Sequence, residues 1–298
     1  IIEEINMYLD TPIIYIGELW KKLLYGDQPA GWDVAGTKES VSKITRGQIL
    51  DYMKFQYVAS NTIVCVAGNI REPIAIKKIK KYFSKISTMK SLKKLKIIER
   101  QTGPECLLNF KKTDQAHLAF GVRSYSLFHP QRYTLELLAV ILGGMMSSRL
   151  FIEVREKLGL AYYIKTSSES DPDTGCLVTL AGIDNNKVEK GISTILKEYK
   201  KISLRAIPGS ELKKAKENLK GKLALSLESS DAKASFFAGQ ELLENRILTL
   251  KDIFTKIDKV TVNDILEVAK DIFRPEKLNL ALIGPFKNKR KFEKLLTI

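Results

Sequence analysis

The chain has 298 residues, of which 44% are apolar and 28% are charged, and its formal net charge at pH 7 is +15. This length suggests about two domains, each able to bury a real hydrophobic core. No apolar run reaches the roughly 18 residues that a membrane-spanning helix needs, so we expect no such helix. The basic residues are spread along the chain without the aromatic pattern of an RNA-binding sheet, so we do not expect nucleic acid as a partner.

Three cysteines, Cys65, Cys106 and Cys176, lie far apart in apolar segments. Their odd number and their spacing favour buried free thiols over a disulfide framework or a cysteine metal site. Free thiols are typical of a reducing compartment, so we expect a cytoplasmic protein. A disulfide between two of them stays an alternative if the protein is exported, because a leader ahead of Ile1 would not be visible here.

Hydrophobic periodicity predicts two modules in chain order. The first, residues 1–86, has helices at 5–25, 46–56 and 73–84 and a strand at 62–67. Residues 87–103 form a linker, because the lysine-rich segment 85–100 has little apolar periodicity and should be exposed and flexible. The second module, residues 104–298, has strands at 105–111, 116–123, 161–169, 175–181 and 278–283, and helices at 132–142, 149–158, 187–201, 209–229 and 231–245.

An internal repeat connects the two modules. Residues 41–69 align without a gap to residues 257–285, with identical pairs at Lys43/Lys259, Thr45/Thr261, Ile49/Ile265, Leu50/Leu266, Lys54/Lys270 and Gly68/Gly284. Each copy has a threonine helix cap, an amphipathic helix, a break and an apolar strand that ends in glycine. The repeat predicts a duplicated module, and the layout of predicted strands and helices is an α+β fold in which a mixed sheet carries helices on one face.

The segment 143–164 is rich in local signals. Its glycine pair gives the backbone freedom, Ser147 or Ser148 can cap a helix at about 149–158, and Gly159 can end that helix in a left-handed turn. By itself the segment leaves two interpretations open for Arg155 and Tyr162. They are either a surface ion-pair former and an ordinary strand aromatic, or two residues of a site.

This segment closely resembles a signature of the pitrilysin and insulinase-like zinc peptidases, the inverzincin family that also contains the mitochondrial processing peptidases and non-catalytic relatives. The resemblance implies that Arg155 and Tyr162, seven residues apart, contribute to substrate and transition-state binding, with Tyr163 as a neighbour. It also implies two similar halves, each a mixed, antiparallel-rich sheet covered by helices, that close around a chamber like a clam. Residues 1–86 would then be the end of the metal-side half, and residues 104–298 a complete C-terminal half.

A second match begins at Ile1, where the sequence Ile-Ile-Glu-Glu-Ile-Asn-Met-Tyr is similar to the family's segment that carries its third zinc ligand. The resemblance assigns that role to Glu4. Composition alone favours another interpretation, in which Glu3 and Glu4 interact favourably with the dipole of a helix that starts there.

The family's His-x-x-Glu-His element, which supplies two zinc ligands and the general base, is absent. The only histidines, His117 in a strand pattern and His129 in a loop, lack the spacing of a metal pair. The chain starts in the middle of a helix pattern, and the family places the missing element upstream of Glu4. We therefore expect an N-terminally truncated fragment, which would not bind zinc by itself.

The resemblance implies zinc-dependent hydrolysis of extended peptides by the intact protein, with Arg155 and Tyr162 stabilising the developing oxyanion. The fragment would be inactive. The alternative is a non-catalytic family member that serves as a substrate-binding or scaffold partner of an active subunit. In either case we expect exposed apolar surface at residues 1–16 and 62–67, and hence a homodimer or a hetero-oligomer with a related chain.

Overall fold

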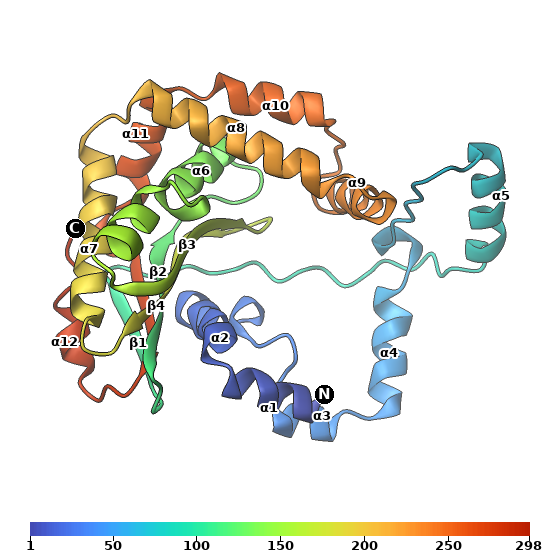
Figure 1. The fold of residues 1–298 in the computed structure, drawn as a ribbon. Helices are drawn as coiled ribbons and strands as arrows, with labels where there is room; N and C mark the ends of the chain where they lie inside the picture. Colours follow the sequence, from blue (N-terminus) through green and yellow to red (C-terminus); the bar gives the residue numbers. More distant parts are fainter. The chain divides into compact units, whose positions relative to one another are not determined.

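The computed structural model describes all residues, 1–298. Contacts within the chain group these residues into two units (Figure 1). The sheet unit comprises residues 1–37, 96–219 and 256–298, and the helical unit comprises residues 38–95 and 220–255. Both units are therefore built from segments that are far apart in the sequence.

Five strands form one sheet in the sheet unit, in the order β1-β5-β2-β4-β3. Their bounds are β1 (Glu105–Phe110), β2 (Gln115–Arg123), β3 (Ala161–Ser170), β4 (Gly175–Asp184) and β5 (Leu278–Gly284). Only β1 and β5 pair in parallel, and the other three pairs are antiparallel. The predicted α+β class with a mixed, antiparallel-rich sheet is confirmed, and all five strands predicted for residues 104–298 are present.

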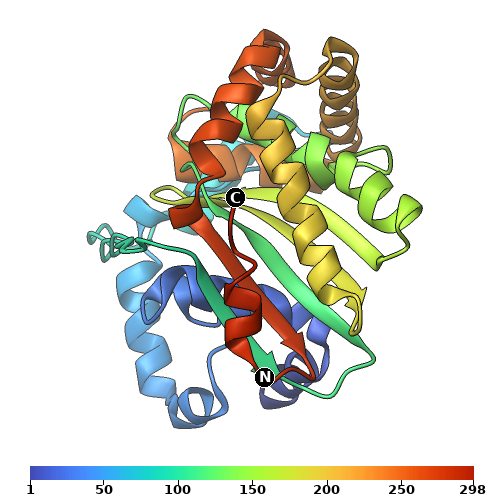
Figure 2. The same cartoon turned by 90° about the vertical axis from the view of Figure 1, so that its left-hand side faces the viewer.

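One face of this sheet is covered by α6 (Arg132–Ala139), α7 (Val188–Leu204) and α11 (Val262–Ile272), as Figure 2 shows. Aromatic stacking joins the layers, because Tyr199 of α7 lies between Phe120 of β2 and Phe273, with ring centroids 5.6 and 4.3 Å away. The buried hydroxyl of Tyr199 is hydrogen-bonded to that of Thr179 on β4, at 2.6 Å. Helix and sheet are thus held by apolar packing with its polar groups satisfied.

The opposite face is covered by α2 (Pro12–Tyr25), which follows α1 (Ile2–Asp10). Ile16, Leu19 and Trp20 of α2 pack on the sheet, and the Trp20 indole donates a hydrogen bond to Cys176 Sγ at 3.4 Å. The sequence predicts helices on one face only. The difference has a physical reason: β2 is buried at both its odd and its even positions from Ala116 to Arg123, so both faces of the strand are covered.

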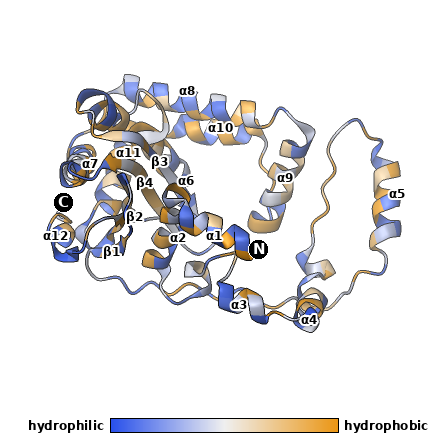
Figure 3. Cartoon of the chain, turned by 60° about the horizontal axis from the view of Figure 1, so that its bottom comes forward, coloured by the Kyte–Doolittle hydropathy of each residue, from blue (hydrophilic) through white to orange (hydrophobic).

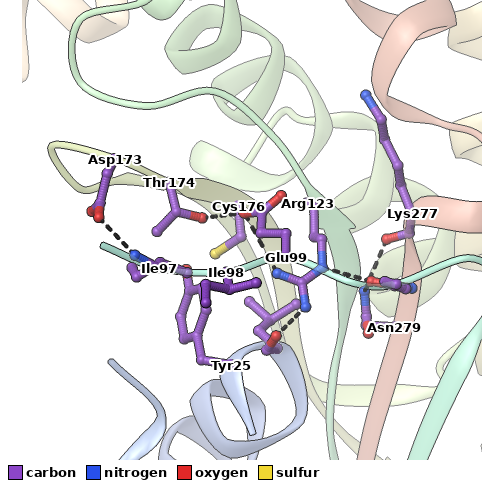
Figure 4. Close-up of polar contacts among 12 residues, drawn as sticks. Tyr25, Ile97, Ile98, Glu99, Arg123, Asp173, Thr174, Cys176, Lys277 and Asn279 are labelled. Atoms are coloured by element: carbon purple, nitrogen blue, oxygen red, sulfur yellow. Dashed lines mark hydrogen bonds and ion pairs between the residues drawn. The ribbon is translucent and has the colours of Figure 1, made fainter. Parts of the chain in front are cut away.

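Arg123 at the end of β2 links α2 to the segment before β1 (Figure 4). Its guanidinium donates to the Leu24 carbonyl and to Gln101 Oε1, the latter at 2.7 Å, and it lies 3.5 Å from Glu99. The Tyr25 ring stacks beneath it, with the guanidinium carbon 5.8 Å from the centroid. A nearly buried cation is thus paired and hydrogen-bonded, as its desolvation requires.

The segment around residue 98 is also fixed by backbone contacts. The Ile97 amide donates to Asp173 Oδ2 at 3.0 Å, and the Ile98 amide donates to Gln28 Oε1 at 2.8 Å. Gln28 returns a hydrogen bond to the Ile98 carbonyl at 3.1 Å. The lysine-rich segment is exposed, as predicted, and hydrogen bonds tie its last residues to the sheet unit. Composition could not show this, because the partners are distant in the sequence.

The helical unit contains α3 (Lys38–Lys43), α4 (Arg46–Gln56), α5 (Glu72–Phe83) and α9 (Ser230–Glu244). Helices α8 (Gly209–Ser226) and α10 (Leu250–Lys259) span the unit boundaries, and α12 (Lys289–Glu293) lies near the C-terminus. Short 3-10 turns occupy η1 (Pro29–Gly31), η2 (Ala59–Asn61) and η5 (Pro275–Lys277). None of these helices has the length and apolarity to span a bilayer.

The strand predicted at residues 62–67 is absent. These residues belong to no β-ladder. Ile63, Val64 and Val66 are exposed, and so are Ile1 and four apolar side chains of the first two helices, namely Ile2, Met7, Ile13 and Ile14. The predicted exposure of apolar surface is confirmed.

The predicted domain boundaries, with residues 1–86 and 104–298 on either side of a linker at 87–103, concern the halves of the intact protein and stay a prediction. Contacts in this structure group residues 1–37 with the sheet because α2 packs on it.

Candidate functional site

The signature segment contains two wide helical turns. The π-helix η3 (Val140–Gly144) follows α6, and the π-helix η4 (Phe151–Lys157) precedes β3. Gly143 lies so close to β3 that an added Cβ would be 2.5 Å from the Thr166 amide nitrogen, so the glycine there permits a close approach. π-helical turns are rare in proteins, and those that occur are often found at functional sites. The sequence predicts an ordinary α-helix at 149–158, because periodicity cannot distinguish the two windings over so short a run.

Neither serine caps this helix with its side chain, and the Ser148 hydroxyl is buried without a partner. The end of the helix is as predicted, since Gly159 has φ of +54° and the Leu160 amide donates back to the Val154 carbonyl at 2.9 Å. This turn delivers the chain directly into β3.

Arg155 is exposed on η4 and makes no hydrogen bond or ion pair. Its guanidinium carbon lies 4.9 Å from the centroid of the Phe151 ring. The other cations of this helix are engaged: Arg149 forms a bidentate pair with Glu211, and Lys157 binds Glu153 at 2.6 Å. The ion-pair interpretation of Arg155 is therefore not supported, and its donors are free to meet a ligand.

Tyr162 lies at a bulge of β3, where the pairing with β4 shifts register between Ala161 and Tyr163. Its side chain is 64% exposed and its hydroxyl has no hydrogen-bond partner. Tyr163, by contrast, is half-buried, and its hydroxyl lies 3.0 Å from Nδ1 of His117. Burial raises the pKa of the Tyr163 phenol and lowers the pKa of His117. Of the two adjacent tyrosines, Tyr162 is thus the one with a free hydroxyl.

Glu4 lies exposed on α1, and its Oε1 accepts a hydrogen bond of 2.9 Å from the Tyr8 hydroxyl. That bond raises the pKa of Tyr8. Glu3 is also exposed beside it. No hydrogen bond or ion pair joins Glu4 to Arg155 or Tyr162, although all three belong to the sheet unit.

The residues of this chain do not fit a zinc site. No three His, Cys, Asp or Glu side chains come together to hold a metal ion, and one carboxylate is too few for a tight zinc site. His117 is bonded to Tyr163, and His129 stacks on Tyr125 with ring centroids 3.8 Å apart. Both histidines therefore make structural contacts. His117 lies in a strand and His129 in a loop, as the sequence predicts.

A cavity of about 610 Å³ lies beside the signature helix and was not predicted. It is lined by η4, α7 and the start of α8, and its charged side chains include the pairs Arg149–Glu211 and Lys201–Glu198. Arg155 and Tyr162 do not line it. Its residues come from three distant segments, so their spacing carried no signal.

Residues 43–219 match the family model described as the peptidase M16 inactive domain. The chain is 34% identical over 286 residues to the uncharacterised zinc protease YmxG of Bacillus subtilis, covering 96% of this chain and 69% of the relative. It is 30% identical to the uncharacterised zinc protease ML0855 of Mycobacterium leprae, covering 100% of this chain and 67% of the relative.

Solved structures show the same fold. A protease from Helicobacter pylori superposes with a TM-score of 0.86 at 24% identity, covering 95% of this chain and 70% of that one. The peptidase M16 inactive domain from Pseudomonas fluorescens has a TM-score of 0.86 at 18% identity, covering 97% and 69%. A chain of complex III2 from Candida albicans has a TM-score of 0.85 at 21% identity, covering 100% and 73%.

Proposed function

This chain belongs to the peptidase M16 family, and on that premise we propose that it is the substrate-contacting part of a zinc-dependent endopeptidase that cleaves extended peptides. The 298 residues are inactive by themselves in this proposal, because they hold one of the zinc ligands, Glu4, and none of the histidines that complete the site. This chain covers 69% and 67% of two relatives that are named zinc proteases, which supports zinc in the intact protein.

The free donors of Arg155 and Tyr162 are the observation that carries this proposal. A guanidinium and a phenol that have no partner in the protein can donate to the carbonyl oxygens of a peptide. Where such a donor meets the oxygen that becomes negative in the transition state, it contributes about 3 to 4 kcal/mol to the lowering of the barrier.

The position of Tyr162 supports an extended substrate. β3 is the last strand of the sheet order, so its outer edge has no strand partner. An extended peptide that adds to such an edge gains main-chain hydrogen bonds, while side-chain pockets provide selectivity. Tyr162, at the bulge near the start of β3, would lie beside a peptide bound there.

The test uses the full-length polypeptide and the variants Glu4→Gln, Arg155→Ala and Tyr162→Phe. We expect kcat to fall roughly 100-fold or more for Arg155→Ala and Tyr162→Phe, the size of loss seen when one oxyanion donor is removed. Glu4→Gln should lose zinc, measured by atomic absorption. Matched controls are Glu3→Gln beside Glu4 and Lys157→Ala on the same helix as Arg155, and both should retain activity. Full activity in all three test variants would refute the proposal.

The second candidate is a non-catalytic family member that holds substrate or scaffolds an active subunit. Two findings favour it: the matching model describes an inactive domain, and one structural neighbour belongs to complex III2. A homodimer or hetero-oligomer with a related chain follows from either candidate, and mass by light scattering tests it. The full reading frame separates the two, because an intact His-x-x-Glu-His ahead of Ile1 supports the enzyme and a degenerate one supports the scaffold.

We also propose a cytoplasmic location, because all three cysteines are free thiols. Burial raises the pKa of the Cys106 thiol to about 11 and that of the Cys176 thiol to about 12. Fractionation of cells that express the full-length protein tests the location, and recovery from the medium would contradict it.

A further inference from the structure

The segment that begins with α5 carries a large positive charge. Between Glu72 and Glu99 the chain has no acidic residue and nine lysines, compared with a formal net charge of +15 for the whole chain. These lysines are Lys77, Lys78, Lys80, Lys81, Lys85, Lys90, Lys93, Lys94 and Lys96. All of them are exposed. More than half of the net charge is therefore concentrated in one short segment.

The helical period places the lysines of α5 on one side. At 3.6 residues per turn, its four lysines fall within an arc of about 160°, which we call the lysine face. Ile76, Ile79 and Phe83 fall on the opposite side, which is available to pack on protein. Ile74 falls inside the lysine arc and is exposed there. Figure 3 shows both hydrophilic and hydrophobic residues along α5.

No acidic side chain neutralises the lysine face, and its four lysines form no ion pair. Helices elsewhere in the chain pair their lysines within one turn, as Lys157 does with Glu153. Like charges four residues apart, such as Lys77 and Lys81, destabilise a helix. An anionic partner laid against this face would remove that repulsion, so the helix itself favours such a partner.

We infer that the lysine face of α5, together with the lysines that follow it, docks the protein on the surface of an anionic lipid bilayer. Clusters of four to eight lysines on an amphipathic helix are typical of binding to anionic lipid headgroups. The contact is peripheral, since no helix of the structure is long and apolar enough to cross a membrane. This inference goes beyond the proposed function and holds for a catalytic or a non-catalytic protein.

The kind of cation favours a lipid surface over a nucleic acid. Residues 72–98 contain no arginine, so every positive charge between Glu72 and Glu99 belongs to a lysine. Arginine has the planar, bidentate donor group that suits single phosphates and base edges, whereas lysine is a hydrated point charge on a flexible stem. Lysines alone are therefore suited to a diffuse layer of negative charge.

Apolar side chains between the lysines support the same partner. Tyr82 is 75% exposed, with Lys81 Nζ 5.9 Å from the centroid of its ring. Leu92 and Leu95, at 65% and 70%, are exposed among the later lysines. Tyrosine is enriched where a bilayer meets water, and leucine gains free energy when it enters the boundary of the acyl chains. The backbone of a nucleic acid offers no apolar layer for these side chains.

Co-sedimentation of the full-length polypeptide with vesicles tests the inference. The vesicles are phosphatidylcholine alone or phosphatidylcholine with one-third phosphatidylglycerol, which is anionic. We expect binding to the anionic vesicles only, and release when the salt rises from about 0.1 M to about 0.5 M, because salt screens the attraction. Equal binding to both kinds of vesicle, or no binding to either, would overturn the inference. So would release from the vesicles by duplex RNA at an equal concentration of phosphate, which indicates a nucleic acid.

A charge variant makes the test specific to this segment. A lysine close to an anionic bilayer contributes roughly fivefold to the affinity, so removal of four lysines should weaken binding about 100-fold or more. The test variant combines Lys77→Gln, Lys78→Gln, Lys81→Gln and Lys85→Gln. The matched control removes the same charge at exposed positions of α7 and its N-cap, and combines Lys187→Gln, Lys190→Gln, Lys197→Gln and Lys200→Gln.

The control variant should bind the anionic vesicles nearly as tightly as the unsubstituted polypeptide. Equal losses in the two variants would mean that only the net charge matters, and would overturn the inference. Circular dichroism should show the same helix content in all three proteins, because glutamine and lysine have similar helix propensities. The readout is vesicle binding and not activity, so its failure is distinguishable from failure of the proposed function.

Discussion

The internal repeat offers a matched pair of substitutions, Ile265→Ala and Ile49→Ala. These residues occupy the same position of α11 and α4, yet Ile265 is 0% exposed and Ile49 is 51% exposed. Removing a buried isoleucine side chain down to alanine costs about 2 to 5 kcal/mol of stability, because the transfer free energy is lost and a cavity remains. Ile265 also lies in the layer that packs on the sheet, where relaxation is restricted.

The same substitution at Ile49 should cost less than about 0.5 kcal/mol, as is usual for surface positions. Alanine also has a higher helix propensity than isoleucine, which offsets part of the lost contact. The assay is urea unfolding, followed by far-ultraviolet circular dichroism for all helices and by tryptophan fluorescence. Trp20 is buried on the sheet, so its fluorescence reports the sheet unit.

The reasoning is refuted if the two variants lose equal stability in the 298-residue chain. That result would mean that α4 is packed as tightly as α11.

Two further predictions follow from close packing and from burial. Gly143→Ala should destabilise the sheet unit by about 1 to 3 kcal/mol because its Cβ meets the backbone of Thr166. Gly144→Ala should be milder, because the nearest atom to its Cβ belongs to the Val140 side chain, at 3.2 Å. Equal effects of the two substitutions in thermal unfolding would contradict this. Burial lowers the folded-state pKa of His117 below the ordinary value of 6.5, so the unfolded chain binds the proton more readily, and stability present above pH 6.5 is lost as the pH falls below it. When the pH falls from 7.5 to 5.5, the free energy of unfolding of His117→Gln should therefore decrease less than that of the unsubstituted chain, as measured by urea titrations. Identical decreases would refute the assignment.

The sequence by itself determined the elements. The gapless repeat predicted a helix, a break and a strand in each copy; the helix and the break recur at the same offset, but the strand forms only in the second copy. Alternation predicted the five strands, and the α+β class followed from them. The positions of Arg155, Tyr162 and Glu4 came from the resemblance, and their roles stay a prediction. Local patterns suffice here because a capping threonine, an apolar stripe and a terminal glycine act within a few residues of each other.

Only the tertiary structure decided what each element contacts. Periodicity could not show that α2 covers the second face of the sheet, or that Arg123 and Gln28 hold the segment near residue 98. It could not show that Arg155 is free while Arg149 is paired, since Glu211 lies far away in the sequence. The repeat makes the physical reason plain: residues 62–68 and β5 share one pattern, but a strand forms only where neighbouring strands accept its backbone hydrogen bonds.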